Sequence, residues 1–289
     1  MGKSLAESYS SAKAIFEQAD DALGFPISRL CFEGPEEELK KTEYTQPALL
    51  TVSIAAFTVL KEHGIAPDYV AGHSLGEYSA LVAAGSLAFA DAVRIVRNRG
   101  RYMQAAVPQG LGAMAALLKL PEGKLDAILE EAAQGEVVTA ANLNSPDQIV
   151  IAGSVGAVSR AMELAKVAGA KRAISLPVSA PFHCPLMKPA QEHLAVDLDA
   201  AAFADLAMPL VNNWQARIIR TGGEARQGLY EQVPNPVRWM ESIRVLIALG
   251  VEQWVEVGPG GVLCGLLKNI DVNQKGNKFG EAQDLAVLL

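Results

Sequence analysis

The chain has 289 residues and a formal net charge of −7. Its residues are 50% hydrophobic and 20% charged, which is ordinary for a globular protein with a substantial core. The acidic balance argues against a nucleic-acid binder, which needs a basic face. We find no apolar run long enough to span a bilayer and no export signal, and the three cysteines are scattered. We therefore expect a protein of the reducing cytoplasm.

Helical and strand-like patterns alternate along the chain, which favours an α/β fold. Thr45 followed by Pro47 is typical of a helix start, and Gly24 and Gly64 are typical of helix ends. Up to residue 106 the sequence predicts helices over 4–22, from 45–47 to 63, over 74–84 and over 91–106, and a buried strand over 67–71.

The pattern changes from about residue 112. It predicts a strand over 114–120, a helix over 121–133, strands over 137–141 and 148–152 joined by a loop, a helix over 155–168 and a strand over 173–178. This β-α-β-β-α-β order is that of the split βαβ, ferredoxin-like unit. We therefore expect a small domain over 110–178, inserted into a large α/β catalytic domain made of 1–109 and 179–289.

A candidate nucleophile lies at the end of the predicted strand over 67–71. The segment Gly72-His73-Ser74-Leu75-Gly76 fits the G-x-S-x-G elbow, in which a serine sits between a strand and a helix with its hydroxyl exposed. The amide of Leu75 would then lie at a helix N-terminus, where it can donate to a developing oxyanion. A glycine-rich turn with a serine cap is the alternative, but the strand and helix around it favour Ser74 as a nucleophile.

A serine nucleophile needs a base, usually a histidine, and the chain has four. His63 is placed to cap helix carbonyls, His73 should point away from the neighbouring serine, and His193 falls on a wet helix face. His183, in a proline-flanked loop, is therefore the candidate base, with an ordinary loop histidine as the alternative. No aspartate is placed to complete a triad, so the orienting group can be a backbone carbonyl.

One arginine lies on the wrong face of its predicted helix. Arg94, Arg97 and Arg101 share one face, whereas Arg99 falls on the apolar stripe. A guanidinium facing the core is costly unless a carboxylate or phosphate pairs with it, and its planar fork suits a carboxylate. The partner is either an internal Asp or Glu or a substrate carboxylate near Ser74. The second reading indicates a dicarboxylic acyl substrate such as malonyl.

These observations meet in one family. The segment 72–80, Gly-His-Ser-Leu-Gly-Glu-Tyr-Ser-Ala, resembles the signature of the malonyl-CoA:acyl-carrier-protein transacylases and of the acyltransferase domains of polyketide synthases. Further matching segments lie in the family's order at 46–49, 99–104, 179–187, 235–239 and 256–260. The resemblance therefore covers nearly the whole chain.

The resemblance implies a hydrolase-like parallel core sheet in the large domain and a ping-pong malonyl transfer. Ser74 would attack malonyl-CoA with His183 as base, and the malonyl-serine ester would pass its acyl group to the phosphopantetheine thiol of acyl carrier protein. Arg99 would pair with the malonate carboxylate, the Leu75 amide would bind the oxyanion, and the backbone carbonyl of Gln232 would orient His183.

The same resemblance implies the setting of the reaction. Malonyl-CoA and acyl carrier protein would be the partners of a cytoplasmic monomer that binds neither nucleic acid nor a membrane. No metal and no cofactor would be needed, since the coenzyme A thioester is itself a substrate.

The chain departs from the family at its start. Family members usually open with a short apolar strand and a Gly-Gln-Gly-Ser-Gln loop whose first Gln supplies an oxyanion amide, whereas Met1-Gly2-Lys3 begins where their first helix begins. We expect a truncated chain with a gap in the sheet that exposes apolar surface and unpaired backbone groups. We also expect lower activity and stability than in a form extended upstream.

Two other functions remain open. A serine esterase or thioesterase would use the same serine and histidine, but it would give Arg99 no substrate role. A truncated, non-catalytic relative would bind the carrier protein without transferring an acyl group. The complete set of Ser74, Arg99 and His183 argues against the second of these.

Overall fold

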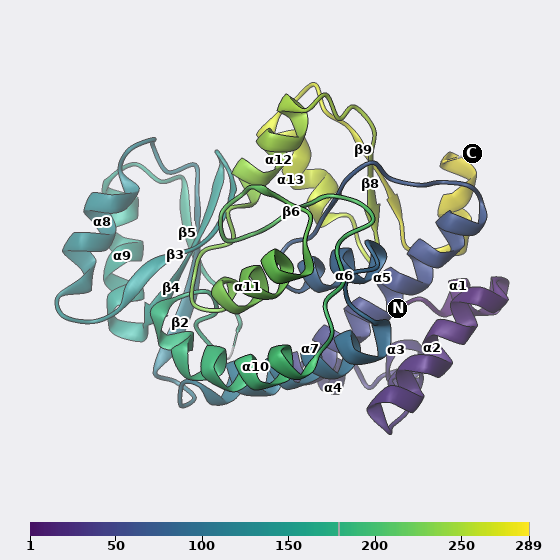
Figure 1. The fold of residues 1–289 in the computed structure, drawn as a ribbon. Coiled ribbons are helices and arrows are strands. Elements are labelled where there is room, and N and C mark those ends of the chain that lie inside the picture. The colour runs from purple at the N-terminus through teal and green to yellow at the C-terminus, as the bar shows by residue number, and fades with distance from the viewer. Residues whose placement is uncertain (179, 289) are drawn as a thin grey trace.

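A computed structural model describes residues 1–178 and 180–288 (Figure 1). Ser179, where we expect the second part of the large domain to begin, and Leu289, where it ends, lie outside the described residues. Within the described residues, no helix is both long enough and apolar enough to cross a membrane.

The described residues form both helices and strands, as the sequence predicts, but the helix predicted over 4–22 is divided at Tyr9, whose backbone is extended. The helices are α1 (Lys3–Ser8), α2 (Ser10–Leu23), α3 (Ile27–Glu33), α4 (Glu36–Leu39), α5 (Thr42–Glu62), α6 (Leu75–Ala83), α7 (Phe89–Ala105), α8 (Leu125–Ala133), α9 (Val155–Val167), α10 (Lys188–Ala200), α11 (Gly222–Gln232), α12 (Trp239–Ala248) and α13 (Val262–Ile270), with short 3-10 helices at Pro185–Met187 and Ala282–Val287. The strands are β1 (Val70–Ala71), β2 (Gly112–Leu118), β3 (Val138–Ser145), β4 (Gln148–Ser154), β5 (Arg172–Ser175), β6 (Leu210–Val211), β7 (Ile218–Ile219), β8 (Trp254–Val257) and β9 (Gly276–Phe279).

The strands outside the 110–178 segment form two separate sheets. β1 pairs in parallel with β6, β6 pairs antiparallel with β7, and β8 pairs in parallel with β9. The fold is thus α/β, as expected, but its core strands are mixed in direction and divided between two sheets. Of the parallel core sheet that the resemblance implies, the described residues contain the parallel pairs β1–β6 and β8–β9.

A groove of about 900 Å³ runs between these two sheets. It is lined by residues of β1 and α6 on one side and of β8 and α13 on the other, with α5 and α12 completing it. Most of its lining is apolar, including Phe57, Ile243 and Trp254. The groove thus exposes apolar side chains between two strand edges. The effect of an upstream extension on activity and stability stays a prediction.

The main hydrophobic core lies among long helices. α5 packs against α2 and α7, and α10 packs on the other side of α7 (Figure 1). Gly100 of α7 allows the close approach to α5, because a Cβ at that position would lie 2.6 Å from the Thr42 carbonyl oxygen. This packing places α7, the helix that carries Arg99, in contact with α2, α5 and α10.

The predicted start of α5 is wrong by three residues. The helix begins at Thr42, so Pro47 lies inside it. The Thr45 hydroxyl does not cap the helix; it donates to the carbonyls of Leu39 and Lys41 instead. A hydroxyl that donates backward in this way leaves the helix free to begin one turn earlier.

The segment from β2 to β5 forms a four-stranded antiparallel sheet in the order β3-β4-β2-β5, with α8 and α9 packed against it (Figure 1). Its β-α-β-β-α-β order is the predicted one, and it has its own cluster of buried apolar residues. We propose that residues 110–178 fold as the inserted small domain. The loop predicted over 142–146 is wrong, because β3 continues to Ser145 and turns directly into β4.

Two glycines give opposite predictions for stability. A Cβ at Gly153 of β4 would lie 2.0 Å from the Val137 carbonyl oxygen, so Gly153→Ala should cost about 1–3 kcal/mol through overpacking. A Cβ at Gly265 of α13 meets open space, so Gly265→Ala should stabilise by up to about 1 kcal/mol. Thermal denaturation measures both, and equal melting temperatures for the two variants would contradict the packing at Gly153.

Candidate active site

Ser74 lies in a tight turn between β1 and α6, as the G-x-S-x-G pattern predicts. Its backbone adopts φ 52° and ψ −108°, a region that ordinary residues seldom occupy. Gly72 is required just before the turn, because a Cβ there would lie 1.9 Å from the Gly76 carbonyl oxygen. The strain and the close backbone approach are those of a nucleophile elbow.

The structure brings His183 to this serine across 109 residues of sequence. Ser74 Oγ lies 2.7 Å from His183 Nε2, and His183 Nδ1 lies 2.9 Å from the backbone carbonyl oxygen of Gln232. Because a carbonyl only accepts, Nδ1 carries the proton, and Nε2 is left to accept from the serine hydroxyl. This is the tautomer that a general base needs.

Gln232 can supply that carbonyl because it is the last residue of α11. The final carbonyls of a helix have no donor within the helix, so they can accept from a side chain. The contact that the resemblance implies between Gln232 and His183 is therefore present in the structure, and no aspartate or glutamate contacts His183 Nδ1 among the described residues.

The surroundings of His183 favour its neutral form. Its imidazole is almost fully buried, and burial lowers its pKa to about 3, with the positive charge of Arg99 acting in the same direction. The ordinary histidine pKa is 6.5, so this ring stays neutral at physiological pH.

Arg99 reaches the nucleophile from α7. Its Nη2 donates to Ser74 Oγ at 3.1 Å and to Gln232 Oε1 at 3.0 Å, and its Nη1 donates to Gln46 Oε1 at 2.7 Å. Only 2% of the residue is exposed, and burial lowers the pKa of the guanidinium. Its hydrogen-bond partners are two neutral amides and a hydroxyl, its guanidinium carbon lies 5.5 Å from the centre of the Tyr78 ring, and within the described residues it takes part in no ion pair.

Within the described residues Arg99 takes part in no ion pair, which favours the second of the two readings of the sequence. A buried guanidinium in an ion pair with an internal carboxylate would be structural, whereas the nearest acidic group among the described residues, the buried Glu77 carboxylate, acts on Arg99 without a direct ion pair. The charge is therefore open to a carboxylate that arrives with a ligand, beside Ser74 Oγ.

Three buried polar residues around the site were missed by the sequence analysis: Gln46, Glu77 and Asn213. The Glu77 carboxylate accepts from Gln232 Nε2 at 2.7 Å and from the Asn213 backbone at 3.1 Å. Burial raises the pKa of Glu77 to about 7. Gln46 and Glu77 gave two signals, since each is a polar residue on an apolar helix and lies in a segment that matches the family, whereas Asn213 gave neither.

The other three histidines lie where elimination puts them, with His193 on the exposed face of α10. His63 Nδ1 bonds the Val59 carbonyl at 2.9 Å near the end of α5, as expected of a capping residue. His73 Nε2 bonds Asn144 Oδ1 at 2.8 Å, away from the serine. His193 packs against the Tyr102 ring, with 5.4 Å between ring centroids.

Leu75 is the first residue of α6, so its amide is one of those that find no acceptor inside the helix. It points from the positive end of the helix dipole, which suits a developing oxyanion. Within residues 1–178 and 180–288 there is no group of three or more His, Cys, Asp or Glu that could hold a metal ion.

The protonation of His183 can be measured directly. Because its pKa is lowered in the folded chain, the unfolded chain binds more protons between pH 3 and 6.5, and stability contributed by the neutral ring is lost as pH falls through that window. In nitrogen-15 NMR of labelled histidines, the ring signal that disappears in His183→Asn should stay neutral down to about pH 5. A midpoint at 6.5 would mean that neither burial nor Arg99 acts on this ring.

Comparison with known proteins gives the chain's relatives. Residues 1–271 match the acyl transferase domain family. The chain is 49% identical over 286 residues to the malonyl CoA-acyl carrier protein transacylase of Escherichia coli O157:H7, which covers 99% of this chain and 93% of the relative.

Two solved structures resemble the fold closely. An acyl carrier protein S-malonyltransferase from Vibrio cholerae is 44% identical, with a TM-score of 0.98 over 100% of this chain and 95% of that one. A malonyl-transacylase in complex with a type II PKS acyl-carrier protein is 45% identical, with a TM-score of 0.97 over 100% of this chain and 94% of that one. The chain belongs to the acyl transferase domain family.

Proposed function

We propose that this chain transfers a malonyl group from malonyl-CoA to the phosphopantetheine thiol of acyl carrier protein, in two steps through a malonyl-serine ester. The proposal is supported by the names of its relatives, which are malonyl transferases acting with acyl carrier protein. It is also supported by the convergence of Ser74, His183 and Arg99 on one point.

In the first step, Ser74 Oγ attacks the thioester carbonyl while its proton passes to His183 Nε2. The negative charge that develops on the carbonyl oxygen is stabilised by the Leu75 amide at the start of α6. As the tetrahedral intermediate collapses, the C–S bond breaks and the coenzyme A thiolate takes the proton from His183. The product of this step is the malonyl-serine ester.

In the second step the carrier's phosphopantetheine thiol replaces coenzyme A. His183 removes the thiol proton, the thiolate attacks the ester carbonyl, and Ser74 leaves with the proton returned by the same nitrogen. The Gln232 carbonyl keeps the ring in the required tautomer throughout. Its place at the end of α11 also stabilises the transient imidazolium, because the C-terminal end of a helix carries partial negative charge.

The free charge of Arg99 is the observation on which the malonyl substrate depends. A guanidinium that is buried, hydrogen-bonded to the nucleophile and in no ion pair with any residue of 1–178 or 180–288 has the position and charge to hold the free carboxylate of a malonyl group. An esterase or thioesterase for plain acyl groups would have to bury this charge for no purpose, which is costly.

The proposal extends to the setting of the reaction. A thioester is already activated, so serine and histidine chemistry transfers it without a cofactor. Cys31, Cys184 and Cys264 are all unpaired, which supports a reducing cytoplasm. We treat the protein as a monomer because the three site residues come from one chain and need no second copy.

The intact mass of the chain after brief exposure to malonyl-CoA tests the nucleophile. We expect a single malonyl adduct on the wild-type chain and none on Ser74→Ala, because among the described residues no other hydroxyl is paired with His183. A malonyl adduct on the folded alanine variant would move the nucleophile elsewhere. An adduct that water removes faster than the carrier thiol would favour the thioesterase.

The role of Arg99 is tested by selectivity rather than by rate alone. In Arg99→Ala the ratio of malonyl to acetyl transfer from their coenzyme A thioesters should fall roughly 100-fold, because a buried carboxylate loses its charged partner. Arg101→Ala, on the same helix but exposed, is the matched control and should keep the wild-type ratio. If Arg99→Ala slowed both substrates equally, the guanidinium would serve the serine and not the substrate.

A further inference from the structure

A single asparagine side chain holds both sides of the Ser74 turn. Asn213 is fully buried; its Oδ1 accepts from the Ser74 backbone N–H at 2.7 Å, and its Nδ2 donates to the Gly72 carbonyl at 2.6 Å. The turn between these two contacts contains the strained Ser74 backbone. A strained backbone persists only where its surroundings fix it, and Asn213 supplies two of the bonds that do so.

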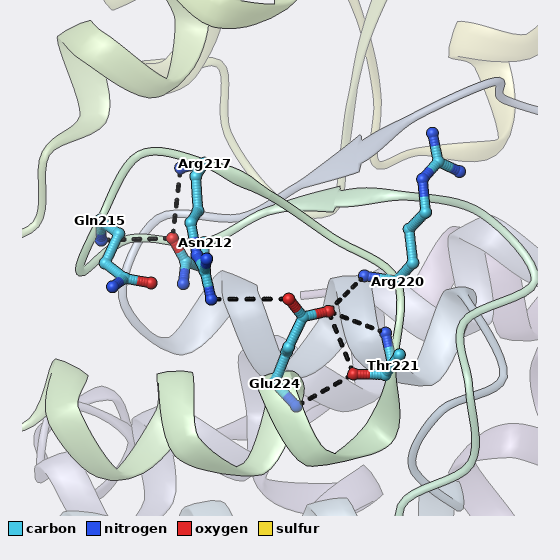
Figure 2. Close-up of polar contacts among 6 residues, drawn as sticks. All are labelled: Asn212, Gln215, Arg217, Arg220, Thr221 and Glu224. Carbon is cyan, nitrogen blue, oxygen red and sulfur yellow. Dashed lines mark hydrogen bonds and ion pairs between the residues drawn. The ribbon is translucent and has the colours of Figure 1, made fainter.

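The position of Asn213 is fixed from two directions. Asn213 lies in the turn that joins β6 to β7. The preceding residue, Asn212, closes this turn, because its Oδ1 accepts from the backbone N–H groups of Gln215 and Arg217 (Figure 2). The capping box of Glu224 and Thr221 then begins α11 next to this hairpin (Figure 2). From the other side, Glu77 Oε2 accepts the Asn213 backbone N–H at 3.1 Å.

Glu77 links the same point to the rest of the site. Its Oε2 also accepts from Gln232 Nε2 at 2.7 Å, and that nitrogen donates to the Ser74 carbonyl at 2.9 Å as well. The other amide atom, Gln232 Oε1, accepts from Arg99 Nη2. Glu77 Oε2 therefore fixes Asn213, which holds the Ser74 turn. It also fixes Gln232, which holds the Arg99 guanidinium.

We propose that Asn213 and Glu77 are positioning residues for acyl transfer: Asn213 holds the Ser74 turn in its reactive geometry, and Glu77 keeps Asn213 and Gln232 in place. Neither side chain contacts Ser74 Oγ, so their effect passes through the backbone of Ser74 and through Gln232. The inference deepens the proposed function and rests on it for the malonyl substrate, but not for the reactivity of Ser74.

The test compares two substitutions that keep the size of the side chain. Asn213→Asp keeps an acceptor for the Ser74 amide but places an oxygen against the Gly72 carbonyl. Glu77→Leu leaves the Asn213 amide and Gln232 Nε2 without their acceptor. Both substitutions should lower the maximal rate of malonyl-serine formation about tenfold or more, because a small displacement of a nucleophile slows its reaction by this order. The half-saturating malonyl-CoA concentration should stay near that of the wild type.

Two further variants separate positioning from folding. Ile219→Ala removes a buried side chain from β7 of the same hairpin, so it should lower the melting temperature without slowing the folded protein. Glu77→Gln keeps an oxygen for both N–H groups and should restore most of the rate lost in Glu77→Leu. If Asn213→Asp does not fold, Asn213→Ser, which adds no charge, serves the same test.

A fluorophosphonate probe makes the result independent of the malonyl substrate. Ser74 Oγ attacks the phosphorus, fluoride leaves and His183 takes the proton, so the labelling rate reports the nucleophile alone. Labelling without any malonyl adduct on the wild type would overturn the proposed function, and the variants would still test the positioning. Wild-type labelling rates in Asn213→Asp and Glu77→Leu, or an equal loss in Ile219→Ala, would overturn the positioning proposal. Failure of the probe to label Ser74 in the wild-type protein would also overturn the positioning proposal.

Discussion

The site is organised around a buried positive charge that no described residue joins in an ion pair. Arg99 is held by the amide oxygens of Gln46 and Gln232, which fix the guanidinium without neutralising it. A carboxylate in either place would form an ion pair and remove the charge from the substrate's reach. The same constraint explains the base: an aspartate beside His183 would lie next to Arg99 as well, whereas the neutral carbonyl of Gln232 orients the ring and leaves the charge free.

Gln232 carries three different functions in one residue. Its backbone carbonyl orients His183, its side-chain oxygen holds Arg99, and its side-chain nitrogen bonds the Ser74 carbonyl. All three depend on the end of α11, which leaves the carbonyl free, and on Glu77, which fixes the amide. Base, nucleophile and guanidinium thus share one support, so a shift of α11 would change all of them together.

The sequence predicts the parts of the site whose chemistry is local. The elbow of Ser74 is fixed by neighbouring glycines, and Arg99 is conspicuous because a charge on an apolar helix face needs a reason. The alternation of helices and strands and the β-α-β-β-α-β segment are likewise readable from periodicity. The role of Asn213 could not be predicted from periodicity, because Asn213 lies 139 residues after Ser74 and reaches the elbow only through the folding of the β6–β7 hairpin. The prediction of where α5 begins was wrong for a similar reason. The Thr45 hydroxyl donates to the carbonyl of an earlier residue, and no pattern within the helix reveals this contact.

The antiparallel sheet β3-β4-β2-β5 is hydrogen-bonded to the rest of the chain close to Ser74. Asn144 of β3 bonds the ring of His73, the residue before Ser74, and the Leu143 amide donates to the Val237 carbonyl. The Val237 amide in turn donates to the Ala141 carbonyl, so the backbone of β3 is tied to the large part from both sides of Asn142. Such backbone bonds fix position more firmly than side-chain contacts of the same number, because no rotatable side-chain bonds intervene. The sheet is therefore part of what holds the elbow, and a displacement of β3 would be passed to Ser74 through His73.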